Sequence, residues 1–171
     1  VQTCALPISC DALNPVFFHY ITTKTPYVVL KFAMTLDGKI ATRTGASKWI
    51  TGEAAREHVH RLRGRYAGIL AGIGTVLADD PMLNCRIDGA HQPLRIILDS
   101  HLRIPMGSRL VRSAKEYPLL IVCNESARDR EEGASRIQKL EEAGAKVWTL
   151  PEKNGHPDLN VLMQRLGEEK I

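Results

Sequence analysis

Three basic residues could bind an anionic ligand or balance charge in a reaction. Lys31 interrupts the apolar run 27–34, and a lysine in such a run must be paired, extend its ammonium group to solvent or serve a function. Arg63 and Arg86 are candidate clamps for a phosphate group, because the guanidinium fork matches phosphate oxygens. Judged by residue type alone, a solvated surface position is favoured for both arginines.

Two short motifs could add a phosphate cradle and an acid. Gly72-Ile73-Gly74 carries half of the dinucleotide-binding fingerprint but lacks the third glycine at the required spacing, so a tight turn is favoured. The backbone amides there and the Thr75 hydroxyl could still contact phosphate oxygens. Asp79-Asp80-Pro81 is either a metal-binding pair or a turn before proline. Adjacent carboxylates point apart in most backbones, which favours the turn, and one of the two could still act as an acid or an orienting group.

The cysteines and histidines do not have the spacing of a metal site. Zinc requires clustered cysteine or histidine ligands. No Cys-x-x-Cys pair is formed by the four cysteines, Cys4, Cys10, Cys85 and Cys123. His58 and His60 are two residues apart in a predicted helix, a spacing that turns them to different faces. We therefore expect no bound metal.

The composition is typical of a globular domain with one core. The chain has 171 residues, of which 44% are hydrophobic and 25% charged, and its formal net charge is +4 at pH 7. This mild excess suits an anionic small molecule as well as nucleic acid. Only 5% of residues are aromatic and the basic residues form no stripe, so we expect no nucleic-acid partner. No apolar run reaches membrane-spanning length and no secretory leader is recognisable, so we expect a cytoplasmic protein without a membrane partner.

Apolar runs that alternate with helical patterns predict an α/β fold with a mostly parallel central sheet flanked by helices. The predicted strands are 27–34, 67–71, 94–98, 119–123 and 146–150. The predicted helices are a short one within 10–25, then 52–66, 126–143 and a last one after Asp158. Thr51 is expected to cap the second helix, Asp158 to cap the last, and Gly144 and Gly167 to end the last two. Residues 168–171 resemble the start of another strand, which predicts a sheet that is incomplete at its C-terminal end.

The predicted sheet indicates where a ligand would bind. In parallel α/β sheets, ligands bind beyond the carboxyl ends of the strands. Three segments follow strands directly and carry small or polar residues, namely 34–39, 72–81 and 99–100. Trp49 stands alone in a polar loop, where core packing is the more common role of a tryptophan.

Three motifs in this order resemble one enzyme family. They are residues 31–41 (KFAMTLDGKIA), 47–51 (SKWIT) and 75–81 (TVLADDP). The chain resembles the reductase half of the bacterial riboflavin-biosynthesis deaminase/reductase, whose fold is dihydrofolate-reductase-like. The resemblance covers about residues 10–171. It divides the chain into an unrelated leader (1–9), a remnant of the linker between deaminase and reductase (10–25) and a reductase domain (26–171) that is truncated at its C-terminus.

The resemblance implies NADPH-dependent reduction of 5-amino-6-(5-phosphoribosylamino)uracil to its ribitylamino counterpart. In this family NADPH delivers a hydride to C1′ of the opened ribose, while the protein aligns donor and acceptor. Matching positions imply cofactor contacts by Ala33, Trp49, Thr75, Asp79 and Ser100. They imply substrate contacts by Ser47, Arg63, Leu83 and Arg86, with the arginines on the phosphate. Lys31 and Asp79 would be the polar groups nearest the reacting centre, for proton balance or orientation.

The chain also departs from the family pattern. The zinc signature of the deaminase half is absent, so we expect no deaminase activity, and the family's glycine-rich loop lies beyond residue 171. We therefore expect this chain to bind NADPH weakly and to turn over little, and we expect a homo-oligomer only for the full-length protein. Two alternatives stay open: a related reductase acting on a diaminopyrimidine or pterin, and a non-catalytic nucleotide-binding fragment.

Overall fold

The computed structural model describes residues 12–171, so the predicted leader and the residues Cys4 and Cys10 lie outside the described residues. By its internal contacts the chain divides into two compact units. The larger unit comprises Leu30–Pro157, and the smaller one joins the N-terminal segment up to Val29 with Asp158–Ile171. All predicted site residues belong to the larger unit.

The larger unit is built on a parallel four-stranded sheet with the strand order β1-β2-β3-β4. The strands are β1 (Gly68–Gly72), β2 (Leu94–Leu98), β3 (Leu119–Asn124) and β4 (Lys146–Leu150). All six residues of β3, an inner strand of the sheet, are buried. The predicted α/β fold with a parallel sheet is confirmed, and the three strands predicted after residue 90 differ from the structure by one residue at most.

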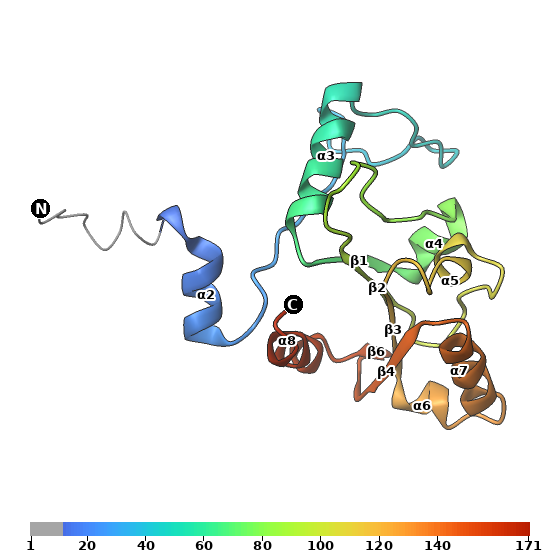
Figure 1. The fold of residues 1–171 in the computed structure, drawn as a ribbon. Helices are drawn as coiled ribbons and strands as arrows, with labels where there is room; N and C mark the ends of the chain where they lie inside the picture. The colour runs from blue at the N-terminus through green and yellow to red at the C-terminus, as the bar shows by residue number, and fades with distance from the viewer. Residues whose placement is uncertain (1–11) are drawn as a thin grey trace, which may run out of the picture. The chain divides into compact units, whose positions relative to one another are not determined.

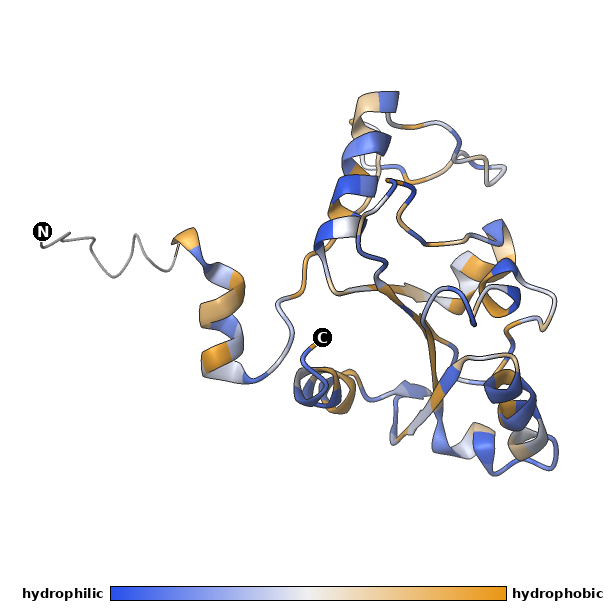
Figure 2. Cartoon of the chain, viewed as in Figure 1, coloured by the Kyte–Doolittle hydropathy of each residue, from blue (hydrophilic) through white to orange (hydrophobic). Residues whose placement is uncertain are grey.

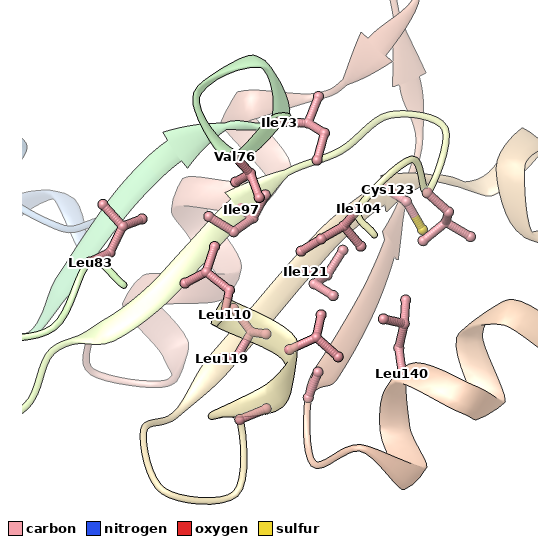
Figure 3. Packing of buried hydrophobic residues seen from close by; sticks show 14 of the residues in the cluster. Ile73, Val76, Leu83, Ile97, Ile104, Leu110, Leu119, Ile121, Cys123 and Leu140 are labelled. Carbon is pink, nitrogen blue, oxygen red and sulfur yellow. The ribbon is translucent and has the colours of Figure 1, made fainter. Parts of the chain in front are cut away.

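Each pair of neighbouring strands is joined by helical segments (Figure 1). They are α4 (Ile73–Asp79), α5 (Arg109–Arg112), and α6 (Glu125–Arg128) with α7 (Gly133–Glu142). Because the strands follow one another in sequence order, crossovers of one hand place their helices on one face of the sheet. One buried apolar cluster accordingly contains side chains from α4, α5 and α7 together with strand residues (Figure 3).

Two further elements complete the larger unit. Helix α3 (Glu53–Arg65) leads into β1 and is mostly hydrophilic, in contrast to the strands (Figure 2). A small antiparallel hairpin of β5 (Glu152–Lys153) and β6 (His156–Pro157) follows β4. The carboxyl ends of the four parallel strands thus lead into α4, residue Asp99, α6 and this hairpin.

The smaller unit consists of α2 (Pro15–Thr23) and α8 (Leu159–Glu168). Asp158 caps α8 as predicted, because its side chain accepts a hydrogen bond of 2.8 Å from Asn160 N. Gly167 does not end this helix, which continues to Glu168. Gly167 instead packs closely against α2 and the residues after it. A Cβ at Gly167 would lie 1.9 Å from Lys24 O, and the Gly167 carbonyl accepts a hydrogen bond of 3.1 Å from Tyr20 Oη.

The strand predicted at 27–34 is not present. The segment carries no strand assignment, and its large side chains are mostly exposed, with Leu30 at 81%. A strand forms only where a neighbour accepts its backbone hydrogen bonds, and within the described residues no strand pairs with this segment. Residues 168–171 likewise form no strand, since Ile171 N donates to Leu166 O in the turn that ends α8.

Three local predictions are also corrected. The tight turn favoured at Gly72-Ile73-Gly74 is not present, because α4 starts at Ile73 directly after Gly72. Gly52, not Thr51, is the N-cap of α3, and it makes no side-chain cap bond. The predicted helix 126–143 is broken into α6 and α7, since the charged stretch 128–132 offers no apolar side chain to a buried stripe. Its predicted end is confirmed, with Gly144 at φ +100° after the helix.

The break between α6 and α7 makes Gly133 intolerant of a side chain. A Cβ there would lie 2.2 Å from Ala127 O and 2.5 Å from Arg128 O. We expect Gly133→Ala to lower the free energy of unfolding by about 3 kcal/mol, because backbone must move to admit the methyl group. Urea denaturation followed by circular dichroism measures this. Gly74→Ala is the control, since a Cβ there meets nothing within 4 Å, and an equal loss in both variants would contradict the explanation.

Within residues 12–171, no helix combines the length and the apolar character needed to cross a membrane.

Candidate functional site

Arg63 and Arg86 come together because a loop docks on the last turns of α3. The loop 81–93 connects α4 to β2, and Cys85 Sγ in this loop donates to His60 O at 3.2 Å. The approach is close because Gly64 has no side chain: a Cβ there would lie 3.3 Å from Cys85 Sγ. Arg63 Nη1 donates to Asn84 O of the loop at 3.3 Å. Glycine at position 64 thus allows the loop that carries Arg86 to lie against the helix that carries Arg63.

The electrostatics of this contact favour an anion. Burial, and secondly the Arg86 charge, lower the pKa of Arg63. Burial followed by the charges of Arg63 and Arg86 lowers the pKa of His60. Three buried polar atoms here lack a hydrogen-bond partner: His60 Nδ1, Arg63 Nε and Asn84 Oδ1. Uncompensated positive charge beside an unused guanidinium N–H is the environment that a phosphate group satisfies.

Leu83 lies between two carbonyl groups that arginines hold. Its side chain is buried and its φ of +53° is unfavourable for a residue with a Cβ. On one side Met82 O accepts from Arg95 Nη1 at 3.2 Å, and on the other Asn84 O accepts from Arg63. The surrounding bonds therefore hold a strained backbone conformation, a feature that is concentrated at binding sites.

Arg95 is a fully buried cation in the middle of the sheet. Its guanidinium group donates to the Ser113 hydroxyl at 2.9 Å and to Tyr117 O at 2.5 Å, besides four other backbone carbonyls. Burial lowers its pKa to about 10, which leaves it charged at neutral pH. Sequence reasoning missed Arg95, although it interrupts an apolar strand as Lys31 was expected to do.

Helix α4 carries Thr75 and Asp79 on one exposed side. The two residues are four positions apart, so they lie one above the other on the helix, and both are exposed. Asp80 ends the helix in the left-handed conformation, and its Oδ1 accepts from Arg109 N at 2.8 Å. Asp79 and Asp80 therefore form the C-terminal end of α4 and not a separate turn before Pro81.

Ser100 lies at the carboxyl edge of the sheet with other polar groups. Its Oγ is 3.2 Å from His156 Nδ1 of the β5–β6 hairpin. Asn124, fully buried at the end of β3, donates to Glu152 Oε2 at 3.0 Å, and its Oδ1 has no partner. Asp99 is buried beside them, and its Oδ2 accepts from Ile104 N at 2.7 Å. This edge offers a hydroxyl, an imidazole and an unused buried acceptor to a polar ligand.

The first two predicted motifs lie in exposed chain. Lys31 and Ser47 are exposed and Ala33 is half-buried. Trp49 is 72% exposed, so the core-packing alternative is wrong, and the Arg56 guanidinium lies 4.4 Å from its ring centre. A hollow of about 500 Å³ is lined by residues between Thr35 and Ile50, among them Asp37, Lys39 and Arg43.

The structure thus brings together part of the predicted set. Arg63, Leu83 and Arg86 form one cluster, whereas within residues 12–171 no hydrogen bond or ion pair joins any two of Lys31, Trp49, Thr75 and Asp79. Neither does the described part of the chain contain a group of three or more His, Cys, Asp or Glu residues that could hold a metal. The arginine cluster lies beside the segments that enter β1 and β2. The expectation that a ligand binds beyond the carboxyl ends of the strands therefore agrees with the positions of Ser100 and Thr75 but not with the position of this cluster.

Comparison with known sequences identifies the family. Residues 26–171 match the family described as the RibD C-terminal domain. The chain belongs to this family. It is 49% identical over 162 residues to the riboflavin biosynthesis protein RibD of Actinobacillus pleuropneumoniae, covering 95% of this chain and 42% of that protein.

Solved structures of RibD proteins share the fold. The Thermotoga maritima diaminohydroxyphosphoribosylaminopyrimidine deaminase/5-amino-6-(5-phosphoribosylamino)uracil reductase is 30% identical, with a TM-score of 0.73, and the match covers 94% of this chain and 41% of that one. Acinetobacter baumannii RibD is 31% identical with a TM-score of 0.74, over 95% and 42%. The chain therefore spans less than half the length of the RibD proteins that it matches.

In this RibD C-terminal domain, the pKa of His60 depends on the charges of Arg63 and Arg86. Because Arg86 contributes to its lowered pKa, we expect Arg86→Ala to raise the pKa of His60, and NMR titration of the imidazole measures it. A base whose pKa is lower in the folded state takes up its proton preferentially on unfolding, so acidification below about 6.5 should destabilise the unmodified chain. Arg61→Ala is the control, and a His60 titration that Arg86→Ala leaves unchanged would contradict the proximity of the charges.

Proposed function

We propose that this RibD C-terminal domain binds and reduces 5-amino-6-(5-phosphoribosylamino)uracil with NADPH as the reductant. The observation that carries the proposal is the arginine cluster, since two adjacent guanidinium groups with an unused N–H fit a phosphate dianion. Asn84, whose backbone carbonyl accepts from Arg63, has a buried Oδ1 without a partner, and this oxygen could accept from a hydroxyl of the attached sugar. The Thermotoga relative is named for this same reductase activity.

In the proposal, substrate and cofactor contact different elements. The substrate would contact Arg63, Leu83 and Arg86 around its phosphate, and Ser47 from the exposed loop. The cofactor would contact five residues of the larger unit: Ala33, Trp49, Thr75, Asp79 and Ser100. The open backbone at Gly72 and Gly74, where a Cβ would meet nothing within 4 Å, leaves room for a ligand beside α4. The unpartnered Asn124 Oδ1 offers an acceptor at the same edge as Ser100.

NADPH, when bound, supplies the hydride of the reaction. The protein's own residues would orient the substrate and exclude other positions of its reactive carbon. The guanidinium groups would fix the phosphate end of the substrate, which limits the positions open to its reactive carbon. Lys31 and Asp79 would be the polar groups nearest the reacting centre, for proton balance or for orientation. We further propose, from the family alone, a cytoplasmic location and self-association of the longer protein.

Binding of paired substrates tests this function without requiring turnover. The aminouracil substrate and its dephosphorylated counterpart are titrated against the 171-residue chain by calorimetry. Stronger binding of the phosphorylated compound, by about tenfold or more, is expected from hydrogen bonds between charged partners. Equal binding of the two compounds would remove the basis for a phosphorylated substrate. Oxidation of NADPH in a single-turnover mixture then tests the reductase step itself.

A further inference from the structure

The side chain of Gln92 makes two hydrogen bonds to backbone groups that no helix or strand pairs. Its Oε1 accepts from Cys85 N at 2.9 Å, and its Nε2 donates to Cys85 O at 3.0 Å. The carboxamide thus pairs with both backbone groups of one residue, as a neighbouring strand would. Because the loop 81–93 contains no strand, Gln92 supplies the pairing from within the loop itself.

Both peptide groups that Gln92 holds bear on the arginine cluster. The first, between Asn84 and Cys85, presents its N–H to Gln92 and its C=O to Arg63 Nη1. The second, between Cys85 and Arg86, presents its C=O to Gln92 and leads directly into Arg86. A peptide group that donates on one side is a stronger acceptor on the other. Gln92 therefore holds the peptide group whose carbonyl accepts from Arg63, and it also holds the peptide group that precedes Arg86.

Other contacts fix the neighbourhood but not this orientation. Cys85 Sγ binds His60 O, which holds the loop against α3. Arg95 binds Met82 O, which holds the loop three residues earlier. Neither contact reaches the two peptide groups on either side of Cys85. Arg63 contacts the first of them through Asn84 O, and Gln92 contacts both. The orientation of the peptide group between Cys85 and Arg86 sets the direction in which the Arg86 side chain leaves the backbone.

We propose that Gln92 is a positioning residue that holds Arg86 opposite Arg63 and so forms the anion-binding site. The inference rests on the proposed function, because it assigns a role within the phosphate subsite. Gln92 need not touch the ligand. Removing its carboxamide leaves both arginines in the chain but frees the backbone that aligns them, so anion affinity falls although the charge is unchanged.

Sulfate binding tests the proposal, since sulfate stays a dianion between pH 5 and 8. We expect Gln92→Met to weaken sulfate binding about tenfold, the equivalent of one hydrogen bond to a charged group. Calorimetry gives the affinity, and the Arg63 Nε–H resonance shows whether sulfate contacts the site. Gln138→Met is the matched control, because Gln138 bonds only Glu142 on the exposed side of α7. Unchanged sulfate affinity in Gln92→Met would overturn the proposal.

A second variant keeps the test decisive if Gln92→Met does not fold. Gln92→Glu retains the shape, and its carboxyl group can pair with both Cys85 backbone groups only when protonated. We expect weak sulfate binding at pH 8 and recovery toward pH 5, in excess of any change in the unmodified chain. Affinity that does not vary with pH in this way would argue against positioning. If the unmodified chain binds no sulfate through Arg63, the phosphate subsite itself fails; if it does and both Gln92 variants bind equally well, only the role of Gln92 fails.

Discussion

Replacing Arg63 with alanine should weaken binding of ribose 5-phosphate about 50-fold. The Arg63 guanidinium is largely shielded from solvent, its Nε–H is unused, and the Arg86 charge beside it is uncompensated. Loss of charge-assisted hydrogen bonds in such a setting costs about 2–3 kcal/mol. Arg86→Ala should have a smaller effect, about tenfold, because Arg86 is exposed and its charge is screened. Isothermal titration calorimetry at low ionic strength measures both.

The controls separate a phosphate contact from general charge. Arg61→Ala removes an equal charge from the same helix, but Arg61 is exposed and pairs with Glu57 at 2.6 Å. We expect it to change the affinity less than twofold. Arg63→Lys keeps the charge and loses the planar fork, so it should recover only part of the affinity. An effect of Arg61→Ala as large as that of Arg63→Ala would mean that only net charge matters.

Replacing Arg95 with methionine should lower the free energy of unfolding by about 4 kcal/mol. The variant leaves the Ser113 hydroxyl and the carbonyls of Met82, Leu110 and Tyr117 without their donor in a buried site. Each buried acceptor that is left without a hydrogen-bond donor costs about 1–3 kcal/mol, and this variant leaves several. Arg95→Lys should recover little, because one ammonium group cannot reach acceptors distributed around a guanidinium plane. Urea denaturation followed by circular dichroism provides the measurement.

Arg128→Met is the reference for this experiment, since Arg128 is exposed and pairs only with its neighbour Asp129. Its expected effect is below about 1 kcal/mol. If Arg95→Met were as stable as Arg128→Met, the Arg95 bonds would not contribute to stability. The same variant should also weaken sulfate binding, since Arg95 holds the carbonyl that precedes Leu83.

The sheet was predictable where burial alone decides the conformation. The runs at 94–98, 119–123 and 146–150 are mostly apolar, and each forms a strand of the central sheet. The run at 27–34 has the same composition, but a strand also needs a partner, and composition does not indicate whether one is present. Short helices were equally hard to predict, because α4 has only seven residues and starts at a glycine pattern typical of turns.

The candidate site was predictable only in its ligand-binding side chains. Arg63 and Arg86 were identified by their chemistry and by a family resemblance, and the structure places their charges close together. Gln92 and Asn84 were not identified, since their roles depend on backbone groups of a loop whose path no periodicity reveals. Arg95 was within reach of sequence reasoning, because a charged residue inside an apolar strand requires buried partners.

The pairing of consecutive strands has a consequence for synthesis. The first residue partners of successive strand pairs are separated by 26, 24 and 26 residues (68 to 94, 95 to 119 and 120 to 146). Each strand pair closes a loop of modest and nearly equal length, so each strand pairs with the strand that precedes it in the sequence and not with a distant segment. The sheet can therefore grow strand by strand as the polypeptide leaves the ribosome, with each completed crossover serving as the template for the next.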